Sequence, residues 1–547
     1  MKTRKRHWVS VICLTLLPLL VAAVALSQSG VDPKLAAGFN AIREKNLRAV
    51  LTFLASDALE GRMSLQRGSE VAINFIAAEF AKAGLKPLAG DSYLQPVELI
   101  EYRADQRAMS VKLVRGGNEQ RYESPKDFIG SFPLETTVSA PVVFAGYGVT
   151  APEFGYDDYA KIDAKGKIVL VFDHEPQEND PKSIFNGLGN TRHANSRLKV
   201  LNAQRRGAVG VLLVSEPNRK HPSNQERLAR IPRTARTSAP LQALAESETK
   251  IPLLTVSDAL AAKLLEPTSK KPGELQSAID ASLQSQSQPL ADTTVEMRIV
   301  NSEHRRATSY NVIGLIEGGD AQLRDETIIF SGHYDHDGAR DGQIFHGADD
   351  NGSGTVGVIE LARAFAANPS KPKRSLLFAV FAAEERGLLG SYYYAAHPLQ
   401  PLDKTRAVIN FDMIGRNETP SAQTEGLIEI AADTSNELNL IGTINSPDYR
   451  AVVERENTRV GLKLNYKWDG DAALNVFQRS DQFPFALRDI PAMWWFTGFH
   501  PDYHQTTDTV DRINFVKMEK ILKLAYLSGW AFADGASGPR FVSKPQS

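Results

Sequence analysis

The stretch Leu376-Leu-Phe-Ala-Val-Phe-Ala-Ala-Glu-Glu385 joins a continuous apolar run to two adjacent glutamates. An apolar run of this length is typical of a strand that helices cover on both faces. Two neighbouring carboxylates repel each other, and each is costly to remove from water. The sequence therefore predicts that metal compensates this pair at a strand end, with one glutamate as a ligand and the other as a general base.

Similar apolar runs recur along the C-terminal half of the chain and predict further buried strands: 311–316, 327–331, 407–411 and 492–496. Helical patterns separate them. The clearest helix is predicted over 354–367, with Ser353 as its N-cap, and another over 514–532. This alternation predicts an α/β fold around a mostly parallel sheet.

Residues able to bind metal follow these predicted strands. His333, Asp412 and His504 each come shortly after a different strand, as the glutamate pair does. Ligands of open α/β sheets gather outside the carboxyl ends of the strands. We therefore expect these side chains to meet at one edge of the sheet.

The ligand set contains two histidines and three carboxylates, which suits zinc and also manganese or cobalt. Five protein groups are too many for one catalytic zinc, but they suit two metals that share a carboxylate. Asp350, in the turn Gly347-Ala-Asp-Asp-Asn-Gly-Ser-Gly354, is the candidate for the shared ligand. Asp335 is expected to orient the His333 imidazole.

Each motif by itself has an ordinary explanation. His333-Tyr-Asp335 is a common pattern, the turn at Asp350 can be a helix cap, and Glu384-Glu385 can begin a solvated helix. The order of the motifs on successive strand ends is what favours a metal site. His336, His346 and His397 are expected on the surface or in loops, and no spacing supports His500.

The N-terminus has the pattern of a signal peptide over residues 1–27. Basic residues precede an apolar run from Trp8 to Leu26, and Ala25-Leu-Ser27 fits a cleavage site. The alternative is an uncleaved membrane anchor. Because Cys13 is the only cysteine, the cleaved chain is expected to contain neither a disulfide nor a thiol nucleophile. These features predict a periplasmic or extracellular protein.

The remaining sequence predicts three further parts: residues 28–138 begin the main domain, 139–289 form a smaller inserted α/β domain, and 290–547 form the catalytic domain. No candidate ligand was assigned to the insert, which is expected to act as a lid or substrate-access element. A formal net charge of −1 over 547 residues provides no global field for nucleic acid or for an anionic membrane.

Residues from about 311 to 532 resemble the catalytic domain of co-catalytic di-zinc aminopeptidases, of the bacterial leucyl aminopeptidase type, in a family that also holds glutamate carboxypeptidases. The motifs that carry the resemblance are Ser331-Gly-His-Tyr-Asp335, Gly347 to Gly354, Ala383-Glu-Glu-Arg-Gly387, Asn410-Phe-Asp-Met413 and Tyr503-His-Gln-Thr-Thr-Asp508. Residues 139–289 resemble the protease-associated domain found in some members, and 51–87, including Ala55 to Arg62, resemble their N-terminal portion.

The resemblance implies a three-layer sandwich with two zinc ions per chain. It implies that His333 and Asp412 bind one zinc, that Glu385 and His504 bind the other, and that Asp350 bridges them before a cis peptide bond. In this family the general base, here Glu384, takes a proton from the water between the metals and returns it to the leaving amine. Tyr503 is either an oxyanion donor or a packing aromatic.

The expected function is that of an exported di-zinc aminopeptidase acting on peptides. The alternatives are a carboxypeptidase, a dipeptidase or a single-zinc glutaminyl cyclase on the same fold, or a non-catalytic binding protein. The expected partners are peptide substrates. Nucleic acid is not expected as a partner, nor is stable membrane association once the signal segment is cleaved.

Overall fold

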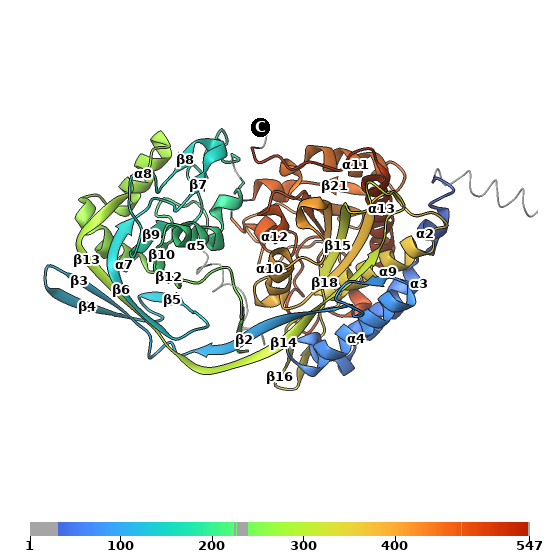
Figure 1. Ribbon diagram of the computed structural model, residues 1–547, viewed down its shortest axis with the longest axis horizontal. Coiled ribbons are helices and arrows are strands. Elements are labelled where there is room, and N and C mark those ends of the chain that lie inside the picture. Colours follow the sequence, from blue (N-terminus) through green and yellow to red (C-terminus); the bar gives the residue numbers. More distant parts are fainter. Residues whose placement is uncertain (1–30, 188, 224–225, 227–238, 472, 545–547) are drawn as a thin grey trace, which may run out of the picture.

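The computed structural model describes residues 31–187, 189–223, 226, 239–471 and 473–544. The predicted signal segment, with Cys13, lies outside the described residues. The described chain forms two lobes, each built on its own sheet (Figure 1). None of the helices in the described part of the chain combines the length and hydrophobicity that a membrane span requires.

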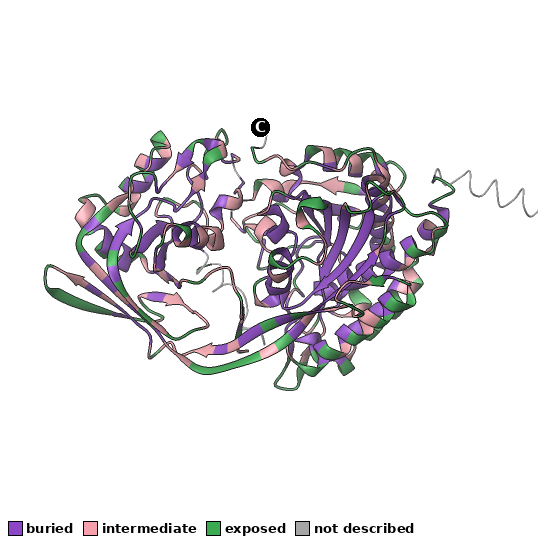
Figure 2. Cartoon of the chain, viewed as in Figure 1, coloured by how far each residue is buried: buried purple, intermediate pink, exposed green. Residues whose placement is uncertain are grey.

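The main sheet has the strand order β11-β2-β14-β18-β15-β19-β22-β20-β21. Its outer strands are β11 (Leu241–Leu244), β2 (Leu94–Ala104), β20 (Glu437–Ile441) and β21 (Lys463–Asn465). Its centre is parallel and consists of β18 (Ser375–Phe381), β15 (Thr327–His333), β19 (Thr405–Phe411) and β22 (Ala492–Phe496). The flanking β14 (Asn301–Ile316) pairs antiparallel with β18. The predicted mostly parallel mixed sheet is confirmed, and Figure 2 shows its central strands buried.

Helices cover both faces of this sheet, as continuous apolar strands require. On one face, α9 (Gly354–Ala366) and α13 (Phe515–Asp534) pack over Phe330 and Phe378, whose rings stack with centroids 5.3 Å apart. On the other face, α10 (Leu389–Ala396) and α12 (Phe483–Ala486) cover the sheet. Their residues Tyr394 and Phe485 contact the alternate strand residues, whose side chains point to this second face. The three-layer sandwich is therefore confirmed.

Ser353 occupies the N-cap position of α9, as predicted, but its side chain makes no capping hydrogen bond. The Ser353 hydroxyl donates a hydrogen bond to the Asp349 carbonyl at 2.7 Å and accepts one from the Ile414 amide at 2.9 Å. The Asn351 side chain instead accepts from the Gly354 amide at 2.8 Å. The turn before the helix contains the cis peptide bond Asp350–Asn351, as the resemblance implied.

The insert lobe has the sheet order β4-β3-β13-β6-β9-β10-β12-β5. Its outer strands include β3 (Ser110–Arg115), β4 (Asn118–Glu123) and β5 (Phe128–Gly130). Its parallel part comprises β6 (Thr136–Phe144), β9 (Ile168–Phe172), β10 (Gly210–Val214) and β12 (Leu253–Val256). The chain leaves the main sheet through β2 (Leu94–Ala104) and returns through β13 (Gln288–Ile299) and β14. Because β2 and β14 pair antiparallel, two adjacent strands connect the lobes (Figure 1).

Candidate metal centre

The sequence-predicted ligands of the main lobe do meet at the carboxyl edge of the parallel strands. His333 is the last residue of β15, Asp412 directly follows β19, and Glu384 and Glu385 begin the short turn Glu384–Arg386 after β18. All of these side chains are buried, as are Asp350 and His504. The strand-end rule therefore placed residues from distant parts of the sequence correctly.

One group of side chains surrounds His333. Its Nε2 atom lies 3.5 Å from Asp412 Oδ1, 3.6 Å from Glu384 Oε2 and 3.6 Å from Asp350 Oδ1. Among the described residues, neither His333 Nε2 nor Asp412 Oδ1 has a hydrogen-bond partner. Ligands about 2.1 Å from a tetrahedral zinc stand roughly 3.4 Å from each other, so this spacing fits a shared ion.

A second group surrounds His504. Its Nε2 atom lies 3.3 Å from Asp350 Oδ2 and 3.6 Å from Glu385 Oε2. Asp350 therefore directs one carboxylate oxygen to each group, which is the arrangement that a bridging carboxylate needs. The donor set of imidazole and carboxylate, without sulfur, fits zinc.

His336 lies inside this second group; it is in a loop, as expected, but it is not at the surface. It is fully buried, and its Nδ1 atom lies 3.0 Å from Glu385 Oε1 and 3.9 Å from Asp350 Oδ2. The chain turns inward after β15, which carries His336 under the sheet edge. Its position three residues after His333, at the same strand end, was the available signal. His397 is exposed, as expected.

Further acidic side chains orient the groups. The Asp335 carboxylate accepts from the amides of Glu384 at 3.0 Å and Glu385 at 3.3 Å, while His333 Nδ1 lies 3.1 Å from the Asp335 carbonyl oxygen. Asp335 thus fixes both glutamates as well as the imidazole. Asp337 Oδ2 lies 2.8 Å from His504 Nδ1, a contact that sequence reasoning missed.

The first group is supported by the segment that follows residue 475. Ser480 donates to Asp412 Oδ2 at 2.6 Å. Asp481 is fully buried, and burial raises its pKa to about 7. His500, which had no support from spacing, is buried with its Nε2 atom 3.2 Å from Asp349 Oδ2. These residues form a polar layer behind the candidate ligands.

The electrostatics of the site favour a bound cation. Burial, with the charges of Glu385 and Asp412, holds the pKa of Asp350 well above its ordinary value. Burial and the charge of Glu385 do the same for Glu384, against the opposing effect of His333. Without a cation, these carboxyl groups hold their protons more tightly than they would in water. A divalent ion would remove that repulsion.

Arg62 anchors the loops that carry the candidate ligands. Its guanidinium is buried and donates to the carbonyl oxygens of Tyr334 at 2.8 Å, His346 at 2.7 Å, Gly347 at 2.8 Å and Leu54 at 2.5 Å. Burial lowers the pKa of Arg62 to about 10, so the group is still charged at neutral pH. The N-terminal segment thus holds the His333 and Asp350 loops in place.

Tyr503 is partly buried next to His504. Its ring packs edge-on against His504, with centroids 4.1 Å apart, and against Phe499 at 5.3 Å. Arg479 Nη2 donates to its hydroxyl at 3.4 Å. The packing and the polar contact together leave both interpretations of Tyr503 open.

The insert also contains a cluster able to bind metal, so the expectation that it has no candidate ligands is wrong. His174, Glu178, Glu216 and His221 converge there. His174 and Glu178 follow β9 and Glu216 follows β10, which are adjacent parallel strands. The strand-end rule that identified the main site would have found this cluster as well.

Residues 311–527 match the family model of peptidase family M28, and residues 138–264 match that of the PA domain. The two matches show that residues 311–527 are similar to peptidase family M28 and that residues 138–264, ahead of them, are similar to the PA domain. The PA match lies between β2 and β14 of the main sheet, as expected for an insert.

Among curated proteins, the chain is 28% identical over 242 residues to Leucine aminopeptidase 2 of Arthroderma otae, covering 40% of this chain and 44% of that protein. It is 26% identical over 254 residues to Leupeptin-inactivating enzyme 1 of Streptomyces exfoliatus, covering 43% and 50%. The chain spans half or less of the length of these relatives.

Among solved structures, the aminopeptidase from Aneurinibacillus sp. strain AM-1 is 19% identical with a TM-score of 0.48, covering 94% of this chain and 99% of that one. A zinc aminopeptidase from Bacillus subtilis is 18% identical with a TM-score of 0.43, covering 92% and 98%. The activity of this chain therefore has to be argued from its own residues.

Replacing Arg62 by Met should lower the free energy of unfolding by about 3 kcal/mol or more, because several buried carbonyl oxygens lose a charged donor. Urea denaturation followed by tryptophan fluorescence measures the change. Zinc retained after dialysis should fall in the same variant, since the ligand loops lose their anchor. Arg67→Met at an exposed position is the matched control. Equal stability of the two variants would contradict the anchoring role.

Proposed function

We propose that this protein is a di-zinc exopeptidase, and specifically an aminopeptidase that removes N-terminal residues from peptides. The observation that carries the proposal is the pair of ligand groups joined by the two oxygens of Asp350. The M28 match and the names of the aminopeptidase relatives support the same reaction.

His333 and Asp412 would hold one zinc, Glu385 and His504 the other, and Asp350 both. The ions would supply Lewis acidity, which polarises the substrate carbonyl and makes water acidic enough to be deprotonated near neutral pH. The protein's part is to keep these side chains in place. Asp337 orients His504, and Ser480 orients Asp412.

Glu384 is the proposed general base. Its backbone amide is held by Asp335, and its Oε2 atom lies at the edge of the first ligand group, 3.6 Å from His333 Nε2. Burial raises the pKa of a carboxyl group, and such a group accepts a proton more readily than an exposed one does. Glu384 would take a proton from the attacking water and return it to the leaving amine.

A carboxypeptidase would need a cationic group, usually Arg, for the substrate carboxylate. Two arginines beside the site are already engaged. Arg62 donates to backbone carbonyl oxygens, and Arg416 Nη2 lies 2.7 Å from Asp502 Oδ2. This engagement favours the aminopeptidase over the carboxypeptidase and the dipeptidase, which both hold a substrate carboxylate. The two ligand groups joined by Asp350 favour it over the single-zinc glutaminyl cyclase.

The proposal includes export, which rests on the N-terminal sequence pattern alone. It also includes peptides as the substrates, without nucleic acid or stable membrane partners.

We further propose that the insert controls access of substrates to the site. In support, the insert contacts the main lobe through side chains: Glu248 Oε1 of the insert lies 3.0 Å from Arg488 Nη2 of the main lobe.

Glu384→Gln should lower kcat by roughly 10²–10⁴-fold, because the amide cannot accept the proton. Zinc content, measured by plasma mass spectrometry, should be unchanged, since the substitution preserves shape. Glu425→Gln at an exposed position is the matched control. Turnover by Glu384→Gln at the wild-type rate would disprove the assigned role.

The type of peptidase can be decided with matched substrates. An aminopeptidase should hydrolyse aminoacyl-p-nitroanilides with a free amine and fail on their N-acetylated forms, because the free α-amine is part of recognition. A chelator should abolish turnover, and added zinc should restore it. Hydrolysis of N-blocked peptides from their carboxyl end would instead establish a carboxypeptidase.

Tyr503→Phe distinguishes the two interpretations of this residue. If the hydroxyl stabilises the developing oxyanion, kcat should fall by about 10²-fold while KM changes little. Steady-state kinetics on one free-amine substrate measures both constants. An unchanged kcat would leave Tyr503 as a packing residue.

A further inference from the structure

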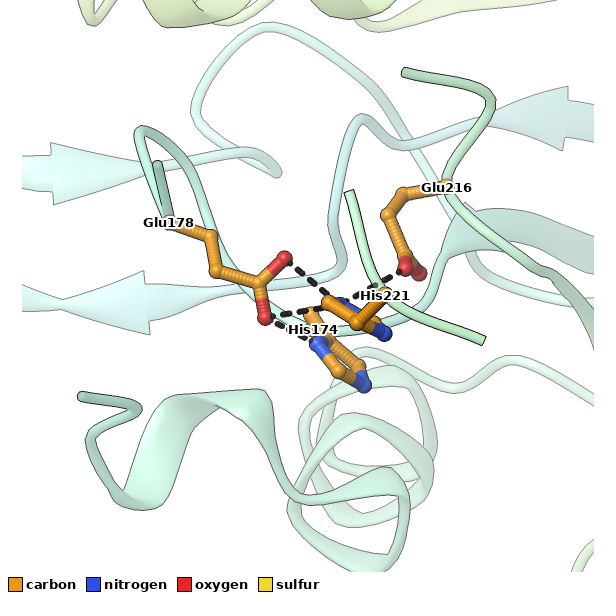
Figure 3. A group of neighbouring side chains, drawn as sticks. All are labelled: His174, Glu178, Glu216 and His221. Carbon is orange, nitrogen blue, oxygen red and sulfur yellow. Dashed lines mark hydrogen bonds and ion pairs between the residues drawn. The ribbon is translucent and has the colours of Figure 1, made fainter. Parts of the chain in front are cut away.

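The four-residue cluster of the insert is formed at the carboxyl ends of two parallel strands. Asp173 to Glu178 leave β9, and Glu216 and His221 follow β10. Figure 3 shows the side chains of His174, Glu178, Glu216 and His221 pointing toward one another. The cluster belongs entirely to the insert, so its ligands are distinct from those of the main-lobe centre.

The spacing is that of metal ligands. Each residue offers one nitrogen or oxygen atom, and the four atoms lie within 4.8 Å of one another. His221 Nε2 lies 3.1 Å from Glu178 Oε2 and 3.4 Å from Glu216 Oε1, and His174 Nδ1 hydrogen-bonds to Glu178 Oε1. The two imidazole rings stack with centroids 4.7 Å apart. Two nitrogens and two oxygens are a complete donor set for a tetrahedral ion.

The charge of the cluster requires compensation. His174, Glu178 and Glu216 are buried, and the His221 side chain is 9% exposed. Within the described residues, Glu216 Oε1 accepts no hydrogen bond. The nearby buried Lys199 directs its ammonium at the carbonyl oxygens of Tyr147 and His174. Two carboxylates with two neutral imidazoles carry −2, which one divalent cation would neutralise.

Protons are the alternative to a metal ion as the means of neutralising the negative charge of the cluster. Burial opposes a positive charge on His174, yet its hydrogen bond to Glu178 and the charge of Asp173 raise its pKa to about 9. The His221 pKa is raised as well, against burial, by Glu178. A metal would displace these protons, so its affinity should rise with pH.

We propose that His174, Glu178, Glu216 and His221 form a further metal site in this protein, for one divalent ion of the zinc class. The site is closed by four protein ligands, which is typical of a structural ion. The partly exposed edge of His221 provides the entry path.

The site is linked to the main lobe through Asn475. The Asn475 side-chain amide lies 3.1 Å from His174 Nε2 and hydrogen-bonds to Asn190. The same segment continues to Arg479 and Ser480, which contact Tyr503 and Asp412. An ion in the insert would therefore stabilise the segment behind the main-lobe ligands.

Metal content tests the site directly. Full-length wild type, Glu216→Gln and His221→Gln are stripped with chelator, titrated with Zn²⁺ at pH 8 and freed of excess zinc. Plasma mass spectrometry should find one zinc fewer per chain in both variants than in wild type. His304→Ala, at an exposed histidine of β14, should match wild type. Equal zinc content in all four proteins overturns the proposal.

A crystal of the zinc-titrated wild type provides a second measurement that does not depend on the folding of a variant. An anomalous difference peak at the zinc edge should lie among the four side chains. Because the insert and main-lobe positions give separate peaks, failure of one site is distinguishable from failure of the other. A main-lobe peak with none in the insert would show a proton-linked cluster without metal and would overturn the proposal.

Discussion

The gathering of buried carboxylates at one edge of the main sheet is the constraint on which the rest of the structure depends. Asp350, Glu384, Glu385 and Asp412 converge with little exposure to water. Burial and mutual repulsion both disfavour their ionised forms. Such an arrangement needs imidazoles, protons or a metal cation to compensate the charge, and a surrounding backbone that prevents the side chains from moving apart.

The backbone is held by charged groups directed at peptide units. Arg62 donates to carbonyl oxygens of the His333 and Asp350 loops, while Asp335 accepts from the amides of both glutamates. Asp508 accepts from the amides of Asp349, at 3.0 and 3.1 Å, and of Asp350, at 3.1 Å. Cationic and anionic side chains thus replace the regular hydrogen bonds that these turns cannot make.

The insert is joined to this centre both covalently and by contact. Two paired strands carry the chain out and back, and the segment from Asn475 to Ser480 reaches from the insert cluster to Asp412. A change in the charge of the insert cluster is therefore positioned to affect the main-lobe site. This connection gives the insert a physical route to the main-lobe site.

The sequence by itself determined the central strands of the main lobe and the helices α9 and α13. The apolar run 492–496 has the same bounds in the structure, because a strand buried on both faces is apolar along most of its length. The strand-end rule then brought His333, Asp412 and the glutamate pair together. The rule depends only on topology, so it needed no side-chain geometry.

Only the tertiary structure decided which polar residues of the turns face inward. His336 and Asp337 lie in an irregular segment without periodicity, and the cluster of His174 and Glu216 unites residues from two turns of the insert. The direction of such side chains is set by long-range contacts, including the anchoring by Arg62, and not by local pattern. The sequence fixes where ligands can gather, while the packing of the loops decides which of them do.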